Sequence, residues 1–179
     1  MNTQAFNLIF SKEAAAAIFN VAVKAIKLIK LVKKVVLVVI AGERPQFYSR
    51  SLFTDYFVNS RKQVAQSVAV AQSYWATATQ ATGFSYIAYQ GDKTYEIHEH
   101  HGRIRCGCPD AKAQRQAFGA ENMGCCTHGY ALLGLLGFDR LSDFQQGRFN
   151  PDRQANGARV AVSIPQKVPA AVRQAVGVG

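Results

Sequence analysis

The spacing of apolar residues predicts helices at the start of the chain. From Ser11, a residue type that can cap a helix, apolar side chains recur at helical intervals as far as Val36, with lysines on the opposite face. Residues 1–42 are therefore expected to form a basic amphipathic helical arm. The β-branched run from Val35 to Ile40 leaves a strand open for the end of this arm.

A second helical pattern follows Pro45. Apolar positions recur from Phe53 to Trp75, and only Ser60 interrupts them. Residues 43–83 are expected to be a helical segment that packs on the core. It is either one long helix or two helices with a break near Asn59.

At Phe84 the spacing of apolar residues changes from the helical period of 3.6 to the strand period of 2. Two short aromatic and β-branched segments are joined by a Gly-containing loop, which predicts a β-hairpin with Tyr95 and Ile97 facing inward. We expect these elements in turn: strands over 84–90, 94–100 and 103–106, a helix from Pro109 to Phe118, and a buried helix over 127–136.

Residues 139–179 have the composition of a basic linker or tail. They contain Asn-Pro, Asn-Gly and two further prolines, and residues 159–164 could add an edge strand. The fold class predicted from these patterns is α+β: a small hairpin-plus-helix core with additional N-terminal helices and an irregular C-terminal tail.

The distribution of charge is more informative than its total. The formal net charge of the 179 residues is +10, which makes nucleic acid, an anionic membrane face or an acidic protein candidate partners. Residues 84–138 carry five positive and five negative side chains, so the basic excess lies entirely in the flanking segments. This neutral segment holds all four cysteines and all four histidines.

The cysteines and one histidine form two close pairs. Cys106-Gly-Cys108 and Cys126-Thr-His128 are separated by 17 residues. A structural zinc site needs four such donors in a tetrahedron, and Gly107 permits the tight turn that lets two neighbouring thiolates reach one ion. The second pair stands at the start of an apolar helix, where the helix dipole favours thiolate.

These residues, in this order and setting, resemble the SWIM-type zinc finger over residues 84–138. That family is marked by Cys-x-Cys, a variable loop and Cys-x-His, with a β-hairpin before and a helix after. The resemblance implies a zinc-stabilised core that holds one structural Zn²⁺, and it implies DNA binding or protein interaction. The ligands that it implies are Cys106, Cys108, Cys126 and His128.

The remaining cysteine and histidines are expected to be structural. Adjacent residues near a helix start project about 100° apart, so Cys125 and Cys126 should not both bind one ion. Cys125 is expected to be a small buried side chain. His98, His100 and His101 are expected to lie on a polar strand face beside Glu96 and Glu99, because no second cysteine pair accompanies them.

The sequence argues against secretion and against membrane spanning. The N-terminus lacks the positive n-region of a signal peptide, so an intracellular setting, cytoplasmic or nuclear, is expected, and there Cys/His clusters indicate metal rather than disulfides. The longest apolar run, Val35 to Ala41, is far shorter than the roughly 18 residues that a spanning helix needs.

Enzyme activity is not expected. Four protein ligands leave no open position on the zinc, and the chain has no nucleophile elbow, phosphate-binding loop or helical His-Glu-x-x-His. A zinc deaminase would need Glu two residues after its His, where Tyr130 stands. No small-molecule substrate is therefore expected.

The leading hypothesis is a zinc protein that binds nucleic acid, with DNA favoured over RNA, assisted by its basic flanks. One alternative is a zinc-scaffolded protein-interaction adaptor, because the finger itself is neutral. Another is association of the N-terminal helix with a membrane surface. The residues expected to contact nucleic acid are Lys24, Lys27, Lys30, Lys34, Arg103, Arg105 and Arg115.

Overall fold

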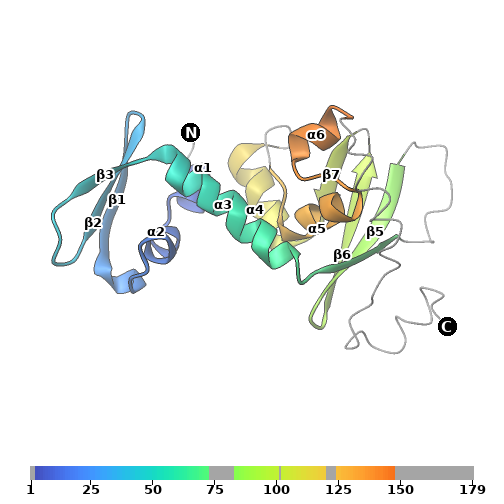
Figure 1. The fold of residues 1–179 in the computed structure, drawn as a ribbon, viewed down its shortest axis with the longest axis horizontal. Helices are drawn as coiled ribbons and strands as arrows, with labels where there is room; N and C mark the ends of the chain where they lie inside the picture. The colour runs from blue at the N-terminus through green and yellow to red at the C-terminus, as the bar shows by residue number, and fades with distance from the viewer. Residues whose placement is uncertain (1–2, 73–82, 101, 120–123, 148–179) are drawn as a thin grey trace. The chain divides into compact units, whose positions relative to one another are not determined.

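The computed structural model describes residues 3–72, 83–100, 102–119 and 124–147. They form helices and two antiparallel sheets, of three and four strands (Figure 1). The predicted α+β class is confirmed at the level of mixed helix and sheet. The elements are α1 (Thr3–Ile9), α2 (Lys12–Phe19), the 3₁₀ helix η1 (Val23–Ala25), β1 (Ile26–Val32), β2 (Val35–Ile40), β3 (Gln46–Ser49), α3 (Arg50–Ala65), β4 (Ala69–Gln72), β5 (Gly83–Gln90), β6 (Lys93–His100), β7 (Arg103–Cys106), α4 (Pro109–Phe118), α5 (Thr127–Leu135) and α6 (Leu141–Gln145).

The chain divides into two compact units, each with a hydrophobic core of its own. Unit 1 comprises residues 1–61 and 113–122, and unit 2 comprises residues 62–112 and 123–179. In unit 1 the core includes Phe10 and Phe53, whose ring centroids lie 5.6 Å apart. In unit 2 the core includes Ile97 and Leu132. Among the described helices, none has the length and hydropathy needed to cross a membrane.

The predicted basic helix of residues 1–42 is wrong beyond Phe19. Ser11 does cap α2, since its hydroxyl accepts a hydrogen bond from the Ala14 N–H at 3.1 Å. The helix ends at Asn20, whose φ of 52° is left-handed and incompatible with another helical turn. The residues that follow form η1, β1 and β2, so the alternative of a strand over Val35–Ile40 is the one that holds.

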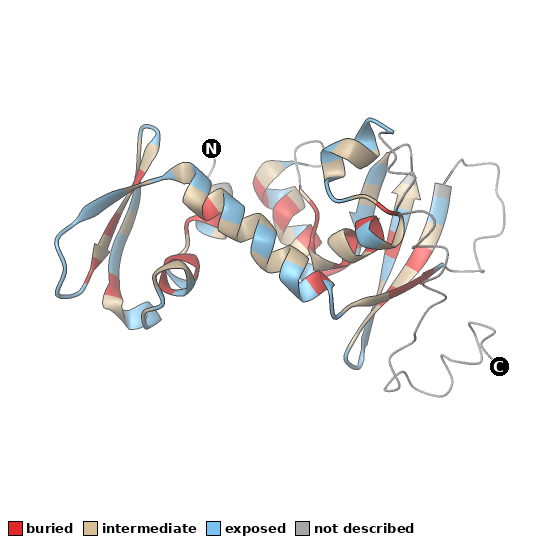
Figure 2. Cartoon of the chain, viewed as in Figure 1, coloured by how far each residue is buried: buried red, intermediate tan, exposed pale blue. Residues whose placement is uncertain are grey.

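The three-stranded sheet of unit 1 has one face in the core and one face outside it. Val36, Val38 and Ile40 of β2 are buried, whereas the residues between them are half-buried (Figure 2). Cross-strand pairing of Ile29 with Val38 and of Leu31 with Val36 places these β1 side chains on the core face as well. Lys33, with a φ of 53°, forms the tight turn between the two strands.

The helical prediction for residues 43–83 holds only for its middle part. Helix α3 is continuous through Asn59 and Ser60, and Phe53 on its inner face is fully buried. Residues before and after it form strands β3 and β4, so Ala71, which was expected on a helix, lies in a sheet. Trp75 lies outside the described residues.

Unit 2 contains the predicted hairpin, the start of the predicted helix α4 and the whole predicted helix α5, whereas residues 113–118 of α4 belong to unit 1. Gln90 of β5 pairs with Lys93 of β6 across a turn in which Gly91 has a φ of 62°. The sheet order is β4-β5-β6-β7, and α5 contacts all four strands. Ile97 faces inward and is completely buried, as predicted.

The segment predicted to be a linker or tail begins with an ordered turn of helix. Helix α6 follows α5 closely, and Phe144 packs its ring against Phe138 with centroids 5.2 Å apart. The edge strand considered for residues 159–164 lies outside the described residues.

Candidate metal centre

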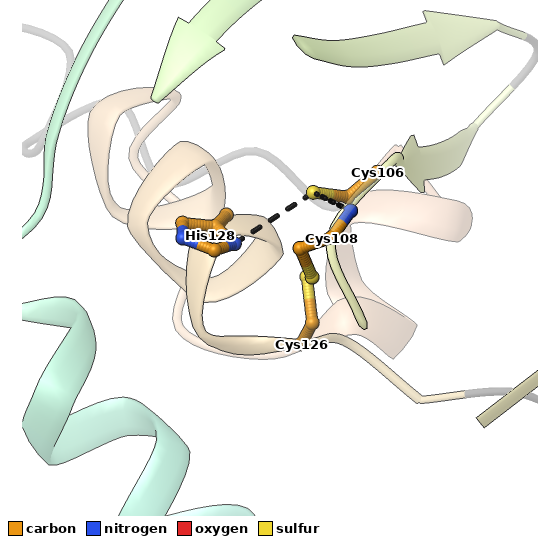
Figure 3. Close-up of side chains that lie close together, drawn as sticks. All are labelled: Cys106, Cys108, Cys126 and His128. Carbon is orange, nitrogen blue, oxygen red and sulfur yellow. Dashed lines mark hydrogen bonds between the residues drawn. The ribbon is translucent and has the colours of Figure 1, made fainter. Parts of the chain in front are cut away.

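Four side chains of unit 2 converge in its interior. Cys106 is the last residue of β7, Cys108 precedes α4, Cys126 is the N-cap of α5, and His128 lies in the first turn of that helix. All four residues are buried, and one ligand atom from each lies within 4.8 Å of the others. Figure 3 shows these side chains facing one another. This grouping could hold one metal ion.

Each of the three sulfurs accepts a backbone hydrogen bond. The N–H of Cys108 donates to Cys106 Sγ at 3.5 Å, that of Ala111 to Cys108 Sγ at 3.3 Å, and that of Gly129 to Cys126 Sγ at 3.4 Å. Such donors stabilise the thiolate form, which is the form that binds metal. The two turns after Cys106 and Cys108 and the start of α5 thus provide polar support for negative sulfur.

The orientation of His128 is set by Gln90 at the end of β5. His128 Nε2 lies 3.0 Å from Gln90 Oε1, an oxygen that can only accept, so this nitrogen carries the proton. The other nitrogen, Nδ1, lies 3.7 Å from Cys106 Sγ and faces the sulfurs (Figure 3). Tyr95 packs against the imidazole with ring centroids 4.4 Å apart. The ring is therefore held with Nδ1 toward the cluster.

The pKa values of Cys108, Cys126 and His128 depend on the other members of the cluster. Hydrogen bonds from Cys106 and Cys126 hold the pKa of the Cys108 thiol far below its ordinary value. Hydrogen bonding to Cys106 and Cys108, together with burial, raises the pKa of Cys126. Burial alone would lower the pKa of His128, but the sulfurs of Cys106 and Cys108 outweigh it and raise the pKa to about 9. Negative charge on sulfur in this buried cluster is thus balanced by protons, and a cation could take their place.

The donor set fits a soft or borderline metal ion. Three sulfurs and one imidazole nitrogen match the Cys₃His group of structural zinc sites. Calcium and magnesium require oxygen donors, which this group does not contain. Zinc is one of the ions that such a donor set binds.

Cys125 is buried but stands apart from the four-residue group. Its side chain packs against Gly129, where a Cβ atom would lie only 3.3 Å from Cys125 Sγ. Burial raises the pKa of this thiol to about 12, so it remains protonated. The prediction that Cys125 is a small buried side chain is confirmed.

The histidines of β6 were expected on a polar strand face, and His98 lies there. His98 Nε2 lies 3.5 Å from Glu96 Oε1, and its Nδ1 lies 3.1 Å from Ser85 Oγ. In the part of the chain that the structure describes, these residues do not belong to a group of metal donors. His101 and the side chain of His100 fall outside that part.

The basic residues expected to contact nucleic acid are divided between the two units. Lys24, Lys27, Lys30 and Lys34 are exposed in unit 1, on η1, on β1 and in the turn after β1, rather than on the predicted helix. Arg103 and Arg105 are exposed on β7 of unit 2. Arg115 is half-buried on α4, among the residues of unit 1.

Sequence reasoning missed Gln90. It was read only as the end of a strand, although its position, one hairpin turn away from Tyr95, places it on the face of the sheet that α5 covers. A polar residue on the inward side of a strand was the available signal, because such a residue needs a buried partner.

Comparison with known proteins adds no relative. No family model, no curated protein and no solved structure matches this chain.

Proposed function

We propose that the four converging residues form a structural zinc site of the SWIM type. The observation that carries this proposal is the burial of Cys106, Cys108, Cys126 and His128 within 4.8 Å of one another. A hairpin precedes the first pair and a helix follows the second, which is the arrangement of that family. One Zn²⁺ bound there would join β7 to the start of α5 and add its binding free energy to the stability of unit 2.

The role proposed for this zinc is structural, not catalytic. Four protein donors complete a tetrahedron, so no coordination position is left for water or substrate. Each sulfur also has a backbone donor, and Gln90 fixes the histidine, which is how a permanent site is stabilised.

Elemental analysis of the purified, zinc-reconstituted protein tests the site. We expect one zinc per chain, and its loss in Cys126→Ser and His128→Ala. Serine still caps a helix, so Cys126→Ser removes the metal ligand and retains the cap. The matched control is Cys125→Ala, which should keep its zinc. Absence of zinc from the parent protein, or its full retention in both ligand variants, contradicts the site.

For the biochemical function, we propose non-enzymatic nucleic-acid binding, with DNA favoured. The support is that β7 presents Arg103 and Arg105 at exposed positions and ends in Cys106, so a bound metal would fix the strand that carries both arginines. The net charge of +10 attracts a polyanion to the whole chain.

Fluorescence anisotropy with labelled duplex DNA at increasing salt tests this function. We expect binding at low salt, with a log–log slope that becomes shallower by about 1.8 in R103A/R105A if each arginine contacts one phosphate. The exposed residues Lys93 and Lys112 provide the control, and K93A/K112A should change the slope less. Parallel titration with RNA decides the nucleic-acid type. Lack of binding at low salt, or an unchanged slope in R103A/R105A, contradicts the proposal.

A zinc-scaffolded adaptor is the second candidate, favoured by the neutral charge balance of residues 84–138. In unit 2 the side chain of Phe84 is 55% exposed, as a protein contact would require. Stoichiometric recovery of a partner that survives nuclease treatment and is lost in Phe84→Ser would favour the adaptor over nucleic-acid binding.

A further inference from the structure

The three-stranded sheet of unit 1 has an apolar face that belongs to neither hydrophobic core. Register places alternate residues of β1, β2 and β3 on it, and we call these residues the outer sheet face. Phe47 is 62% exposed and Leu28 is 44% exposed, the former being the most exposed large apolar side chain among the described residues. The other apolar members are half-buried. The outer sheet face consists of Leu28, Lys30, Val32, Val35, Leu37, Val39, Phe47 and Ser49.

Basic side chains stand at both ends of this face. Ile26 pairs with Ile40, so Lys24 before β1 and Arg44 after β2 lie at the same end of the sheet. Lys33 and Lys34 form the turn at the opposite end, and Lys30 lies on the face itself. Between residues 21 and 50 the only acidic residue is Glu43. Lys27 lies at the irregularity of β1 between Ile26 and Leu28, where it lines a surface pocket together with Glu13 of α2. The exposed basic set is Lys24, Lys27, Lys30, Lys33, Lys34 and Arg44.

The composition of this face decides which anionic partner fits it. Base recognition requires stacking rings and hydrogen-bonding groups, but the face has one aromatic ring and one uncharged polar side chain, Ser49. Protein interfaces favour arginine and disfavour lysine, whereas five of the six basic residues here are lysines. Two copies of the face would repel each other through their like charges.

A lipid surface has the complementary chemistry. Aliphatic side chains can enter the boundary between headgroups and acyl chains without needing directional partners. Lysine side chains can extend from an apolar face so that their ammonium groups reach the anionic headgroups. We infer that the outer sheet face of unit 1 binds the surface of an anionic lipid bilayer, with Leu28 and Phe47 inserted and the six basic residues facing the headgroups.

This inference goes beyond the zinc and nucleic-acid functions proposed above. It keeps the membrane partner considered from the sequence but changes the element that carries it, from an amphipathic helix to a sheet. It also gives a separate role to Lys24, Lys27, Lys30 and Lys34, which the sequence had assigned to phosphate contacts with nucleic acid.

Vesicle co-sedimentation of the full-length, zinc-loaded protein tests the inference. Vesicles of phosphatidylcholine alone are compared with vesicles that also contain phosphatidylserine, at low and high salt. We expect binding to the anionic vesicles only, and weaker binding at high salt. Charge reversal in K27E/K30E should weaken binding at least tenfold, because each basic residue near the surface contributes about fivefold. L28S/F47S should weaken it about tenfold by removing the apolar insertion.

The controls use exposed positions of unit 2. K93E/K112E changes the net charge as much as K27E/K30E does, and Phe84→Ser removes an aromatic ring that is 55% exposed, compared with 62% for Phe47. Both should bind the anionic vesicles like the parent protein. Circular dichroism melting checks that the substituted proteins remain folded, which the exposure of Leu28 and Phe47 favours.

The same measurements identify the results that would overturn the inference. Equal binding to neutral and anionic vesicles would show that the lysines do not contribute to membrane binding. If K27E/K30E or L28S/F47S binds the vesicles as well as the parent protein does, the outer sheet face is not the membrane-binding surface. Failure to bind vesicles, combined with DNA binding that K27E/K30E abolishes, assigns the face to nucleic acid instead. Loss of the proposed DNA function in R103A/R105A leaves vesicle binding unaffected, so the two proposals fail separately.

Discussion

At the scale of single residues, Cys126 combines two roles that are usually performed by different side chains. Its sulfur accepts the Gly129 N–H and so caps α5, and the same sulfur lies in the four-residue cluster. Helix N-termini favour negative charge, so the cap and the helix dipole oppose the rise in the Cys126 pKa that the neighbouring sulfurs and burial cause. The start of α5 is thus a part of the candidate metal centre and not only its support.

Gln90 is the residue outside the four-residue group with the most specific role in the centre. Its oxygen accepts from His128 Nε2 at 3.0 Å, which leaves Nδ1 available to a metal ion. We predict that Gln90→Leu weakens zinc binding by about 10- to 100-fold, the usual effect of losing an outer-shell partner. Gln90→Glu should retain most of the affinity, since a carboxylate also accepts this hydrogen bond.

Competition titration with a chromophoric chelator measures the zinc affinity of both Gln90 variants. Gln72→Leu, at an exposed position of β4 in the same unit, is the matched control and should bind zinc normally. Equal affinity of Gln90→Leu and the parent protein would show that the imidazole is held by its packing against Tyr95 alone.

At the scale of elements, the local patterns of residues 84–138 were sufficient to predict the strands and helices that the structure describes there. The strands β5, β6 and β7 and the helices α4 and α5 follow from alternation, a Gly-containing turn, and a proline at the first position of a helix. The Cys and His pairs of the centre could also be recognised, because each pair is only three residues long. Gln90 could not, because its partner lies 38 residues away, and only the pairing of strands and helix brings the two together.

The first unit shows where local patterns mislead. Residues such as Ile29 and Val36 fit a helical stripe, yet their intervals fit a two-stranded hairpin equally well. The strands form here because β2 is rich in β-branched residues and because the backbone of Asn20 is left-handed, which ends α2. The left-handed residue is an asparagine and not a glycine, so the sequence gives little indication of it. In unit 2, strand β4 was not predicted for a related reason: it has only four residues and gains its stability from pairing with β5.

Substitution of Asn20 distinguishes a helix that ends at this residue from a helix that continues through it, because the two structures predict opposite changes in stability. In the structure Asn20 ends α2 with a φ of 52°, so Asn20→Ala should destabilise unit 1 by about 1 to 2 kcal/mol, whereas Asn20→Gly should not. In a continuous helix the order would be reversed, because alanine is a better helix former than asparagine and glycine a worse one. Chemical denaturation of the zinc-loaded variants measures both changes.

At the scale of the whole molecule, two hydrophobic cores and one candidate metal site among the described residues imply that the two units depend on different interactions for their stability. Unit 1 contains Phe10 and Phe53 and none of the four converging residues, whereas Cys106, Cys108 and Cys126 belong to the core of unit 2. A metal bound at the site therefore adds stability to unit 2, where its ligands are already part of the packed interior.

We predict that metal removal and a core substitution act on different unfolding transitions. Chelation with EDTA should lower or abolish the transition of unit 2 and leave that of unit 1 in place. Phe53→Ala should reduce the free energy of unfolding of unit 1 by about 3 to 5 kcal/mol and leave the zinc content unchanged. Calorimetry of the full chain, with and without EDTA, measures both. A single transition that shifts equally under both treatments would show that the units unfold together.

The separation of the two ligand pairs also has a consequence for biosynthesis. Cys108 precedes His128 by 20 residues, and a ribosome adds about 5 to 20 residues each second. For about 1 to 4 s the nascent chain thus offers the first two cysteines without the complete set of four donors. For the zinc site proposed above, the first pair is open to oxidation or to another metal during that interval, so the order in which the donors are synthesised would make the supply of zinc and reductant part of how the site is built.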